Sequence, residues 1–282
     1  MPACLSARIF APPPLAPVRS MAWSQPQVWL GKAFQDIANA PLISLAHGLA
    51  LVLIGALILA IGHNRFWLMA GALSGFLVLG PVVATSLYAI SRAMERGEAV
   101  DLGLIHRSWT QWQSCHASVR GGYWCMVQFG ALLALAATGW VLVSASLITV
   151  MSPVHVATLQ DFVHHVVLAK DGQLFLQWMA LGSFLAAPIF ASSVVAMPLM
   201  LDRRVSVRQA VLTSWSVVLA NPGPMALWAA LIVLLTLLGL GSYLLGLVFV
   251  MPLLGHASWH AYRDLVDASA FPARDEAMEP AT

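Results

Sequence analysis

The sequence predicts an all-α polytopic membrane helical bundle of six transmembrane helices, arranged as three hairpins that are each preceded by an interfacial amphipathic helix. Of its 282 residues, 60% are hydrophobic and only 9% are charged, whereas about 25% of an ordinary soluble domain is charged. The apolar residues form long runs without Asp, Glu, Lys or Arg. Because 14 basic and 12 acidic side chains are too few to cover a soluble monomer, the bundle is expected to face lipid.

Five apolar runs define the expected spans. Four of them, at residues 42–61, 66–90, 124–150 and 174–201, each supply the roughly 20 residues that cross a hydrocarbon core about 30 Å thick. The fifth run, at residues 225–254, would be about 45 Å long as one straight helix, which exceeds that thickness. Glycines at 239 and 241 and a serine at 242 interrupt it, so two spans are expected there, at about 224–240 and 243–261.

The basic residues indicate the orientation of the spans, because Lys and Arg accumulate in short cytoplasmic loops. With six spans, 12 of the 14 basic residues lie on the side that holds both chain termini, and Arg65 and Lys170 lie on the other side. With five spans the distribution would be 10 against 4. Six spans with cytoplasmic N and C termini therefore fit the sequence better.

The expected single transmembrane domain covers residues 27–267, between a disordered N-terminal tail (1–26) and a disordered C-terminal tail (268–282). The N-terminal tail contains four prolines between residues 12 and 17 and lacks the apolar stretch of a secretion signal. A start of translation at Met21 instead of Met1 is an alternative. The net charge of +2, without clustered Lys and Arg, excludes a nucleic-acid groove.

Three units of the domain resemble one another, at about residues 27–98, 99–204 and 205–267. The first and third begin with an amphipathic stretch and change to a span at a proline, at positions 41 and 222. In the third unit, Ser206 and Gln209 have the spacing of a capping box, which predicts a helix start. Amphipathic helices with low charge and large aromatic residues lie in the membrane interface. The alternative explanation of the likeness is that helix-end sequences recur by themselves.

The amphipathic stretch of the first unit covers residues 28–39. Its predicted apolar side carries Leu30, Ala33, Phe34 and Ile37, and its predicted polar side carries Lys32, Gln35, Asp36 and Asn39. The apolar side is expected to lie in the acyl boundary of the membrane.

Two parts of the sequence resemble a known family. The first part comprises GFLVLGP at 75–81, YAISR at 88–92 and ERGE at 95–98, and the second comprises LANPGP at 219–224 and PLLGHASWHAYRD at 252–264. They are similar to a family of uncharacterised bacterial integral inner-membrane proteins, classed as a domain of unknown function and sometimes labelled cytochrome c oxidase-associated. The resemblance covers about residues 28–266. It implies a multi-pass protein of the bacterial inner membrane, and it carries no established catalytic or binding residues.

Three histidines are the candidate metal or haem ligands. His256 and His260 are four residues apart, so both rings lie on one face of a helix, and His47 in the first span would supply a third ligand. Imidazole is the commonest metal ligand in proteins, and haem or copper is the expected cofactor if these rings bind one. In the alternative interpretation no cofactor is bound: His256 and His260 form hydrogen bonds with loop carbonyls at the end of the sixth span, and His47 bonds to a facing helix.

The loop between the third and fourth spans carries a second candidate set, His155, Asp161, His164 and His165. If the segment is helical, Asp161 and His165 share a face and suit copper or zinc on the periplasmic side. The alternative is that they are ordinary loop residues.

Missing motifs limit the function. No expected span contains an acidic or basic residue, which disfavours an ion-coupled transporter. The sequence has no GxxxxGK[ST], HExxH or GxSxG motif, so we expect no catalytic residues. The preferred hypothesis is a non-enzymatic interaction or accessory protein in the lipid bilayer, near a respiratory complex, whose partner is another membrane protein or a second copy. The alternatives are a channel or carrier for a neutral or lipidic solute, and a haem- or copper-binding membrane protein.

Overall fold

The structure is a computed structural model that describes residues 15–62, 66–78, 80–106, 108 and 124–273. In this part of the chain the regular elements are helices, and the only β pairing is two isolated bridges. Among the described residues, four helical segments are long and apolar enough to cross a membrane: Pro41–Gly62, Met126–Met151, Gln173–Asp202 and Pro222–Gly241. The expected all-α membrane bundle is thereby confirmed at this level.

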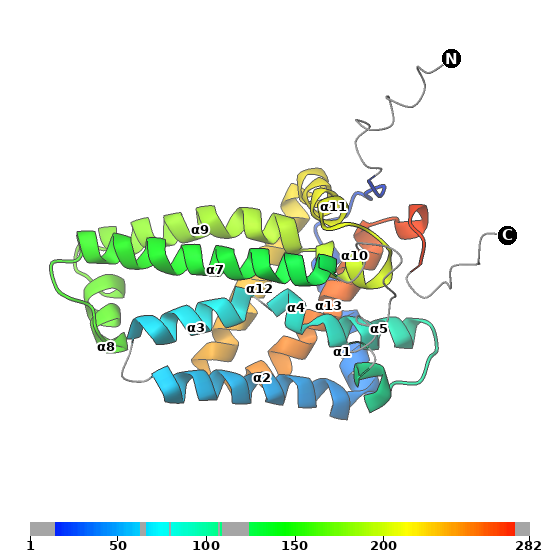
Figure 1. Cartoon of the computed structure of the whole chain (residues 1–282), viewed down its shortest axis with the longest axis horizontal. Coiled ribbons are helices and arrows are strands. Elements are labelled where there is room, and N and C mark those ends of the chain that lie inside the picture. The colour runs from blue at the N-terminus through cyan, green and yellow to red at the C-terminus, as the bar shows by residue number, and fades with distance from the viewer. Residues whose placement is uncertain (1–14, 63–65, 79, 107, 109–123, 274–282) are drawn as a thin grey trace, which may run out of the picture.

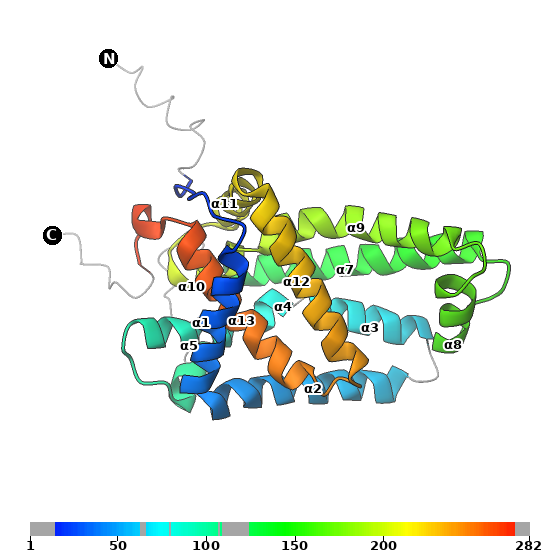
Figure 2. The ribbon, with the colours of Figure 1, turned by 180° about the vertical axis from the view of Figure 1, so that it is seen from behind.

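The helices follow one another in three groups (Figure 1). The first group is α1 (Gln25–Asn39), α2 (Pro41–Gly62), α3 (Phe66–Val78), α4 (Gly80–Val83) and α5 (Thr85–Glu95). The second is α7 (Trp124–Met151), α8 (Leu159–Phe162), the π-helix η1 (Val163–Val167), α9 (Gln173–Ser193) and α10 (Ala196–Asp202). The third is α11 (Val207–Ala220), α12 (Pro222–Gly241), α13 (Leu247–Leu265) and the short 3₁₀ helix η2 (Ala268–Ala270). Helices α2, α3, α7 and α9 run along the long axis of the molecule, and α12 and α13 are inclined to it (Figure 2).

The long C-terminal apolar run is two helices, as its glycines predict. Helix α12 ends at Gly241 and α13 begins at Leu247. The turn between them has positive φ angles of 56° at Tyr243 and 70° at Leu244. The hydroxyl of Ser242 accepts a hydrogen bond from the Gly246 amide (2.7 Å) and donates one to the Gly239 carbonyl (2.8 Å). The Ser242 side chain therefore joins the end of α12 to the residue that precedes α13.

Two other expected spans are interrupted. The run at 66–90 is divided among α3, α4 and α5, and the run at 174–201 between α9 and α10. Pro81 and Pro198 lie in the first turns of α4 and α10, where a missing amide is tolerated. Pro188 and Pro252 lie inside α9 and α13. The hydropathy of the sequence does not reveal these interruptions of the helices, because the residues on both sides are equally apolar.

The first and third groups share a local geometry. Helix α1 passes into α2 at Ala40 with φ −134° and ψ 61°, and α11 passes into α12 at Asn221 with φ −131° and ψ 51°. The capping box of Ser206 and Gln209 is formed as the spacing predicts. Helices α1 and α11 cross the long axis at the same end of the bundle (Figures 1 and 2). In the middle unit the expected leader begins as a helix at residues 102–106, with the Leu104 amide bonded to the Asp101 carboxylate at 2.6 Å, and its residues 109–112 lie outside the described residues.

The two ends of the described chain meet at this end of the bundle. Val18 forms an antiparallel bridge with Val266, flanked by bonds from the Arg19 amide to the Leu265 carbonyl and from the Asp267 amide to the Pro17 carbonyl, both 2.9 Å. Residues 15–26 and 268–273, which the sequence assigns to the two tails, thus pack against the helices. Of these, Ala16 and Phe271 are buried.

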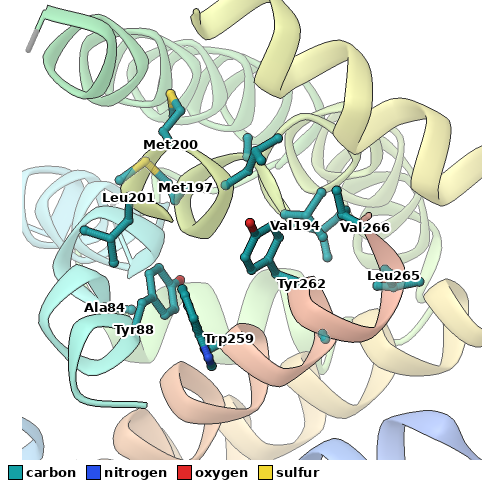
Figure 3. Packing of buried hydrophobic residues seen from close by; sticks show 14 of the residues in the cluster. Ala84, Tyr88, Val194, Met197, Met200, Leu201, Trp259, Tyr262, Leu265 and Val266 are labelled. Carbon is teal, nitrogen blue, oxygen red and sulfur yellow. The ribbon is translucent and has the colours of Figure 1, made fainter. Parts of the chain in front are cut away.

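The largest hydrophobic cluster occupies the same half of the molecule. Its fully buried large side chains include Trp29, Trp228, Trp259 and Tyr262. Figure 3 shows Trp259 and Tyr262 of α13 beside Tyr88 of α5 and the methionines of α10. Helix α13 also packs against α1, α2 and α12, so it is the central helix of the bundle.

Close contact between α2 and α13 depends on Gly48, since a Cβ there would overlap the backbone of Val248. We expect Gly48→Ala to lower the free energy of unfolding by about 1–3 kcal/mol, because a rigid backbone cannot yield as a side chain does. Thermal unfolding of the purified protein in detergent, followed by circular dichroism, measures this.

Gly75→Ala is the matched control, because a Cβ on that α3 residue meets nothing within 4 Å. Its effect is expected to be neutral or stabilising by up to about 1 kcal/mol, since alanine favours a helix. Equal losses in both variants would contradict the close-packing argument.

Candidate functional site

Five polar side chains from four helices form a connected network inside the bundle, which we call the buried polar chain. It consists of Asp36 (α1), Ser44 (α2), Ser91 (α5), and His256 and His260 (α13). Ser44, Ser91 and His256 are at most 1% exposed, and Asp36 is 9% exposed. Sequence reasoning identified the two histidines, and the structure adds the other three members.

Every link in the buried polar chain is short. The Oγ of Ser44 lies 3.0 Å from Nε2 of His256, and Nδ1 of His256 lies 2.7 Å from Oγ of Ser91. The Ser91 hydroxyl donates to Oδ2 of Asp36 at 2.6 Å, and Nε2 of His260 donates to the same oxygen at 2.9 Å. A polar side chain buried in a membrane protein needs such a partner because no water reaches it.

The directions of these bonds fix the tautomer of His256. Since Ser91 gives its proton to Asp36, its oxygen accepts from His256, and Nδ1 of that ring carries the hydrogen. Nε2 of a neutral His256 is then an acceptor for the Ser44 hydroxyl. The hydrogen bonds from Ser44 to His256, from His256 to Ser91 and from Ser91 to Asp36 therefore all run toward the Asp36 carboxylate. This direction stabilises the negative charge of Asp36.

Asp36 is a correction to the sequence analysis, which placed it on the polar side of the first amphipathic helix. The buried face of α1 is formed by Trp29, Ala33, Asp36 and Ile37, whereas Phe34, expected on the apolar side, is 58% exposed. The spacing of this face is i, i+4, i+7 and i+8, so the helical stripe was present in the sequence with a carboxylate in it. A carboxylate is ordinarily expected to face water, but the tertiary packing of α1 buries Asp36.

The pKa of Asp36 reflects two opposing effects. Burial raises it, but the hydrogen bonds from His260 and Ser91, helped by the charges of the two nearby histidines, outweigh burial and bring the pKa below its ordinary value. Asp36 is therefore an anion at neutral pH.

The three candidate metal ligands are only partly brought together. His256 and His260 both approach Asp36, with Nδ1 of His256 3.8 Å from Oδ2. His47 instead pairs its Nδ1 with the Ile43 carbonyl of its own helix at 2.9 Å. The described residues contain no group of three or more His, Cys, Asp or Glu that could hold a metal ion. Metal or haem binding by His47, His256 and His260 stays a prediction, and it would have to displace a serine from His256.

Glu95 holds the end of α5 against α13. Its carboxylate accepts from the Arg263 guanidinium at 2.7 Å and from the Trp259 indole nitrogen at 3.0 Å.

Asp264 binds α1 to α13 in the same way. Its Oδ2 accepts from the amide of Gln25 at 2.7 Å and the indole of Trp29 at 2.9 Å, and Lys32 lies 3.4 Å away. Glu95 and Asp264 thus each bind one basic and one aromatic side chain at this end of the bundle.

Asp202 at the end of α10 is the third such partner. It accepts from the Tyr262 hydroxyl at 2.8 Å and from Arg203 at 3.0 Å. Tyr262 reaches it from α13 through the cluster in Figure 3. Tyr262 is the donor in this bond, because a carboxylate oxygen accepts.

The second candidate set lies at the opposite end of the bundle. The Asp161 carboxylate accepts from the amides of Ala157 (3.1 Å) and Thr158 (2.9 Å), which completes a capping box at the start of α8. His165 uses Nδ1 on the Asp161 carbonyl and His164 on the Gln160 carbonyl. These groups are engaged in local structure, and a copper or zinc site there stays a prediction.

Together, the apolar helices and the sparse, internally bonded polar groups define a polytopic α-helical membrane protein. Residues 68–202 match the model of a family described as "Predicted integral membrane protein (DUF2189)". This match confirms the expected resemblance to an uncharacterised family of membrane proteins. No curated protein and no solved structure gives a significant match. The matched segment runs from α3 to α10 and contains Ser91 of the buried polar chain.

The Trp259 indole gives a test of the Glu95 contact, because Trp259 is 1% exposed. We expect Glu95→Ala to cost about 1–3 kcal/mol of unfolding free energy by leaving the indole N–H without an acceptor. Glu95→Gln keeps an acceptor and should cost less, since a partly exposed ion pair contributes about 0–1 kcal/mol. Denaturant titration in detergent compares the two, and equal losses would argue against the indole bond.

The lowered pKa of Asp36 predicts a loss of stability in acid. Folding lowers this pKa, so the contribution of the carboxylate is complete above the unfolded pKa and disappears as pH falls through the folded value. The protein should lose stability below about pH 4, and Asp36→Asn should be less sensitive to pH in that range. Unfolding midpoints between pH 3 and 7 test this, and parallel pH profiles would refute it.

Proposed function

We propose that the protein crosses the bacterial inner membrane six times, with α3–α5 and α13 as the two crossings beyond the four apolar helices. Backbone pairing of Val18 with Val266 supports an even number of crossings, because both ends of the described chain lie at one end of the bundle. Arg19, Lys32 and Arg263 lie at this end, and Lys170 lies in the loop at the other. The asymmetry favours a cytoplasmic location for both termini.

The proposed role is non-enzymatic: the protein acts as an interaction or accessory protein for another integral membrane protein. The observation that carries this proposal is the buried polar chain, whose five side chains use one another as hydrogen-bond partners. Ser44 and His256 have the pairing of a nucleophile and a base, but both are fully buried.

The outer surface supports the same role. A shallow groove between α3 and α7 has mostly small or aliphatic walls, formed by Gly71, Gly75, Ala134, Ala137, Thr138, Val141 and Leu142. Small residues at such a surface let another transmembrane helix approach closely. A partner helix in this groove would contact the segment that matches the family model.

The topology is tested with single cysteines in a chain whose own three cysteines are replaced. Six crossings predict that Asp171→Cys and Ser242→Cys react with a membrane-impermeant maleimide in intact spheroplasts, and that Arg208→Cys reacts only after permeabilisation. All three positions are exposed in the structure. If Ser242→Cys, like Arg208→Cys, reacted only after permeabilisation, this result would contradict the crossing of the membrane by α12 and α13.

The interaction is tested with a photoreactive amino acid at Thr138 in the groove and, as a control, at Leu234 on the exposed side of α12. Protein adducts formed in native membranes should appear at Thr138 and not at Leu234. Lipid adducts alone at both positions, together with glycerol permeation in proteoliposomes, would overturn the interaction role in favour of a channel or carrier.

A further inference from the structure

A small polar pocket lies where α3 begins and α7 ends, at the end of the bundle that α8 occupies (Figure 1). We call it the loop pocket. Trp67, Ile148 and Thr149 line it from the two helices, and residues 152–156 line it from the loop that follows α7. Its volume is about 210 Å³. One water molecule takes up about 30 Å³ in the liquid, so the loop pocket has room for an organic group of several atoms.

Three hydrogen-bond donors of the loop pocket bind its own walls. The indole N–H of Trp67 donates to the Val156 carbonyl at 3.2 Å, and the Ser152 hydroxyl donates to the Val154 carbonyl at 2.8 Å. The Val154 amide in turn donates to the Ser152 oxygen at 3.4 Å. A ligand that enters the pocket therefore finds these three donors occupied.

The end of α7 supplies a hydrogen-bond acceptor. The Ser152 amide donates to the Ile148 carbonyl at 2.8 Å. The next carbonyl, that of Thr149, would accept from residue 153, but this residue is a proline and has no amide hydrogen. The last carbonyls of a helix also give that end a partial negative charge. The pocket therefore favours a cation that carries N–H groups.

The walls of the loop pocket suit an organic cation better than a metal ion. The described residues that line it include no Asp, Glu, Lys or Arg. His155 of the second candidate set lines the pocket, whereas Asp161, His164 and His165 do not. Calcium and magnesium prefer carboxylate ligands, and zinc takes three or four protein ligands. A neutral imidazole offers one acceptor nitrogen, and an indole such as that of Trp67 attracts ammonium groups.

The pocket lies at the boundary between apolar and polar surface. Val150, in the last turn of α7, is 83% exposed, as suits a side chain in contact with lipid. Pro153 and His155 are exposed in the loop, where the chain has left the apolar helix. Tryptophan is enriched at the level of lipid headgroups, which agrees with the position of Trp67. A headgroup of the surrounding bilayer is therefore the nearest source of an ammonium group.

We propose that the loop pocket binds the primary ammonium group of an ethanolamine phospholipid. The Thr149 carbonyl and the His155 ring accept its hydrogen bonds, and the indole of Trp67 lies beside the cation. Charge-assisted hydrogen bonds of this kind are about twice as strong as neutral ones. A choline headgroup has no N–H and cannot form them. The site goes beyond the proposed interaction role and does not depend on it, since no described residue lines both the loop pocket and the groove that contains Thr138.

The test is native mass spectrometry of the full-length protein released from lipid nanodiscs. The nanodiscs contain equal amounts of ethanolamine, choline and glycerol phospholipids with the same acyl chains. The proposal predicts one retained ethanolamine lipid per chain, held about tenfold more often than the choline lipid, because loss of a charge-assisted hydrogen bond costs about this factor. Equal retention of the ethanolamine and choline lipids overturns the proposal.

Two variants assign this preference to the loop pocket. Pro153→Ala restores an amide that can bond to the Thr149 carbonyl, and His155→Lys places an ammonium group of the protein itself in the pocket. Each is expected to weaken ethanolamine-lipid retention about tenfold, to the level of the choline lipid. Circular dichroism checks folding, and if one variant fails to fold, the other decides. A preference that survives in a folded variant overturns the assignment.

Matched controls make the same chemical changes outside the pocket. Pro188→Ala restores an amide inside α9, and His164→Lys adds an ammonium group on η1. Both positions are exposed, and neither lines the loop pocket. Both controls should keep the wild-type preference. Losses equal to those of Pro153→Ala and His155→Lys would overturn the assignment to the pocket.

Free ethanolamine distinguishes the two sources of the ammonium group. The measurement is repeated in choline-lipid nanodiscs with ethanolamine in the buffer. A headgroup site predicts no retained ethanolamine, because the acyl chains that hold the lipid beside the pocket are absent. Retention that disappears in Pro153→Ala would show that the pocket takes a soluble amine and would overturn the assignment to a headgroup. Adducts at Thr138 test the interaction role separately, so the two proposals can fail independently.

Discussion

The organisation of this protein depends on one constraint: a polar group within the bundle has no water to bind, so a hydrogen bond to another polar group of the chain stabilises it. Two histidines of helix α13 have such hydrogen-bond partners. The two ring nitrogens of His256 are used by serines on α2 and α5, and His260 reaches the carboxylate on α1. Each of these bonds joins α13 to a different helix. Because Gly48 allows the backbones of α2 and α13 to approach, the short bonds and the dense packing occur together.

The first and third groups share a local geometry where an interfacial helix meets a span. Each has an interfacial helix that turns into a span through nearly the same backbone conformation, at Ala40 and at Asn221. Asn221 adds a second function, since its side chain binds the Met21 amide at 2.7 Å and the Arg19 carbonyl at 3.0 Å. The N-terminal segment is thereby fixed beside the end of α13. The two ends of the described residues meet at one end of the bundle, and α8 and η1 lie at the other (Figure 1).

Three acidic residues each have more than one hydrogen-bond partner. Asp202, Asp264 and Glu95 each accept from an aromatic side chain as well as from a basic one. A carboxylate with both partners gives the buried indole or phenol group a hydrogen-bond acceptor and remains in an ion pair. A surface ion pair alone would leave the aromatic group without an acceptor. Absence of charge from the apolar runs was the argument against an ion-coupled protein. Asp36 weakens that argument, because an interfacial helix delivers a carboxylate to histidines that lie within an expected span.

The sequence by itself determined the apolar runs, the break after Gly241 and the capping box at Ser206, because each depends on neighbouring residues and on helical periodicity. It also indicated His256 and His260, whose spacing places them on one face. Only the tertiary structure decided the rest. The interruptions before Pro81 and Pro198 divide runs of uniform composition, and the partners of His256 lie 165 and 212 residues away in the chain. Asp36 faces inward because the donors that stabilise its charge come from α5 and α13, and no pattern within α1 contains them.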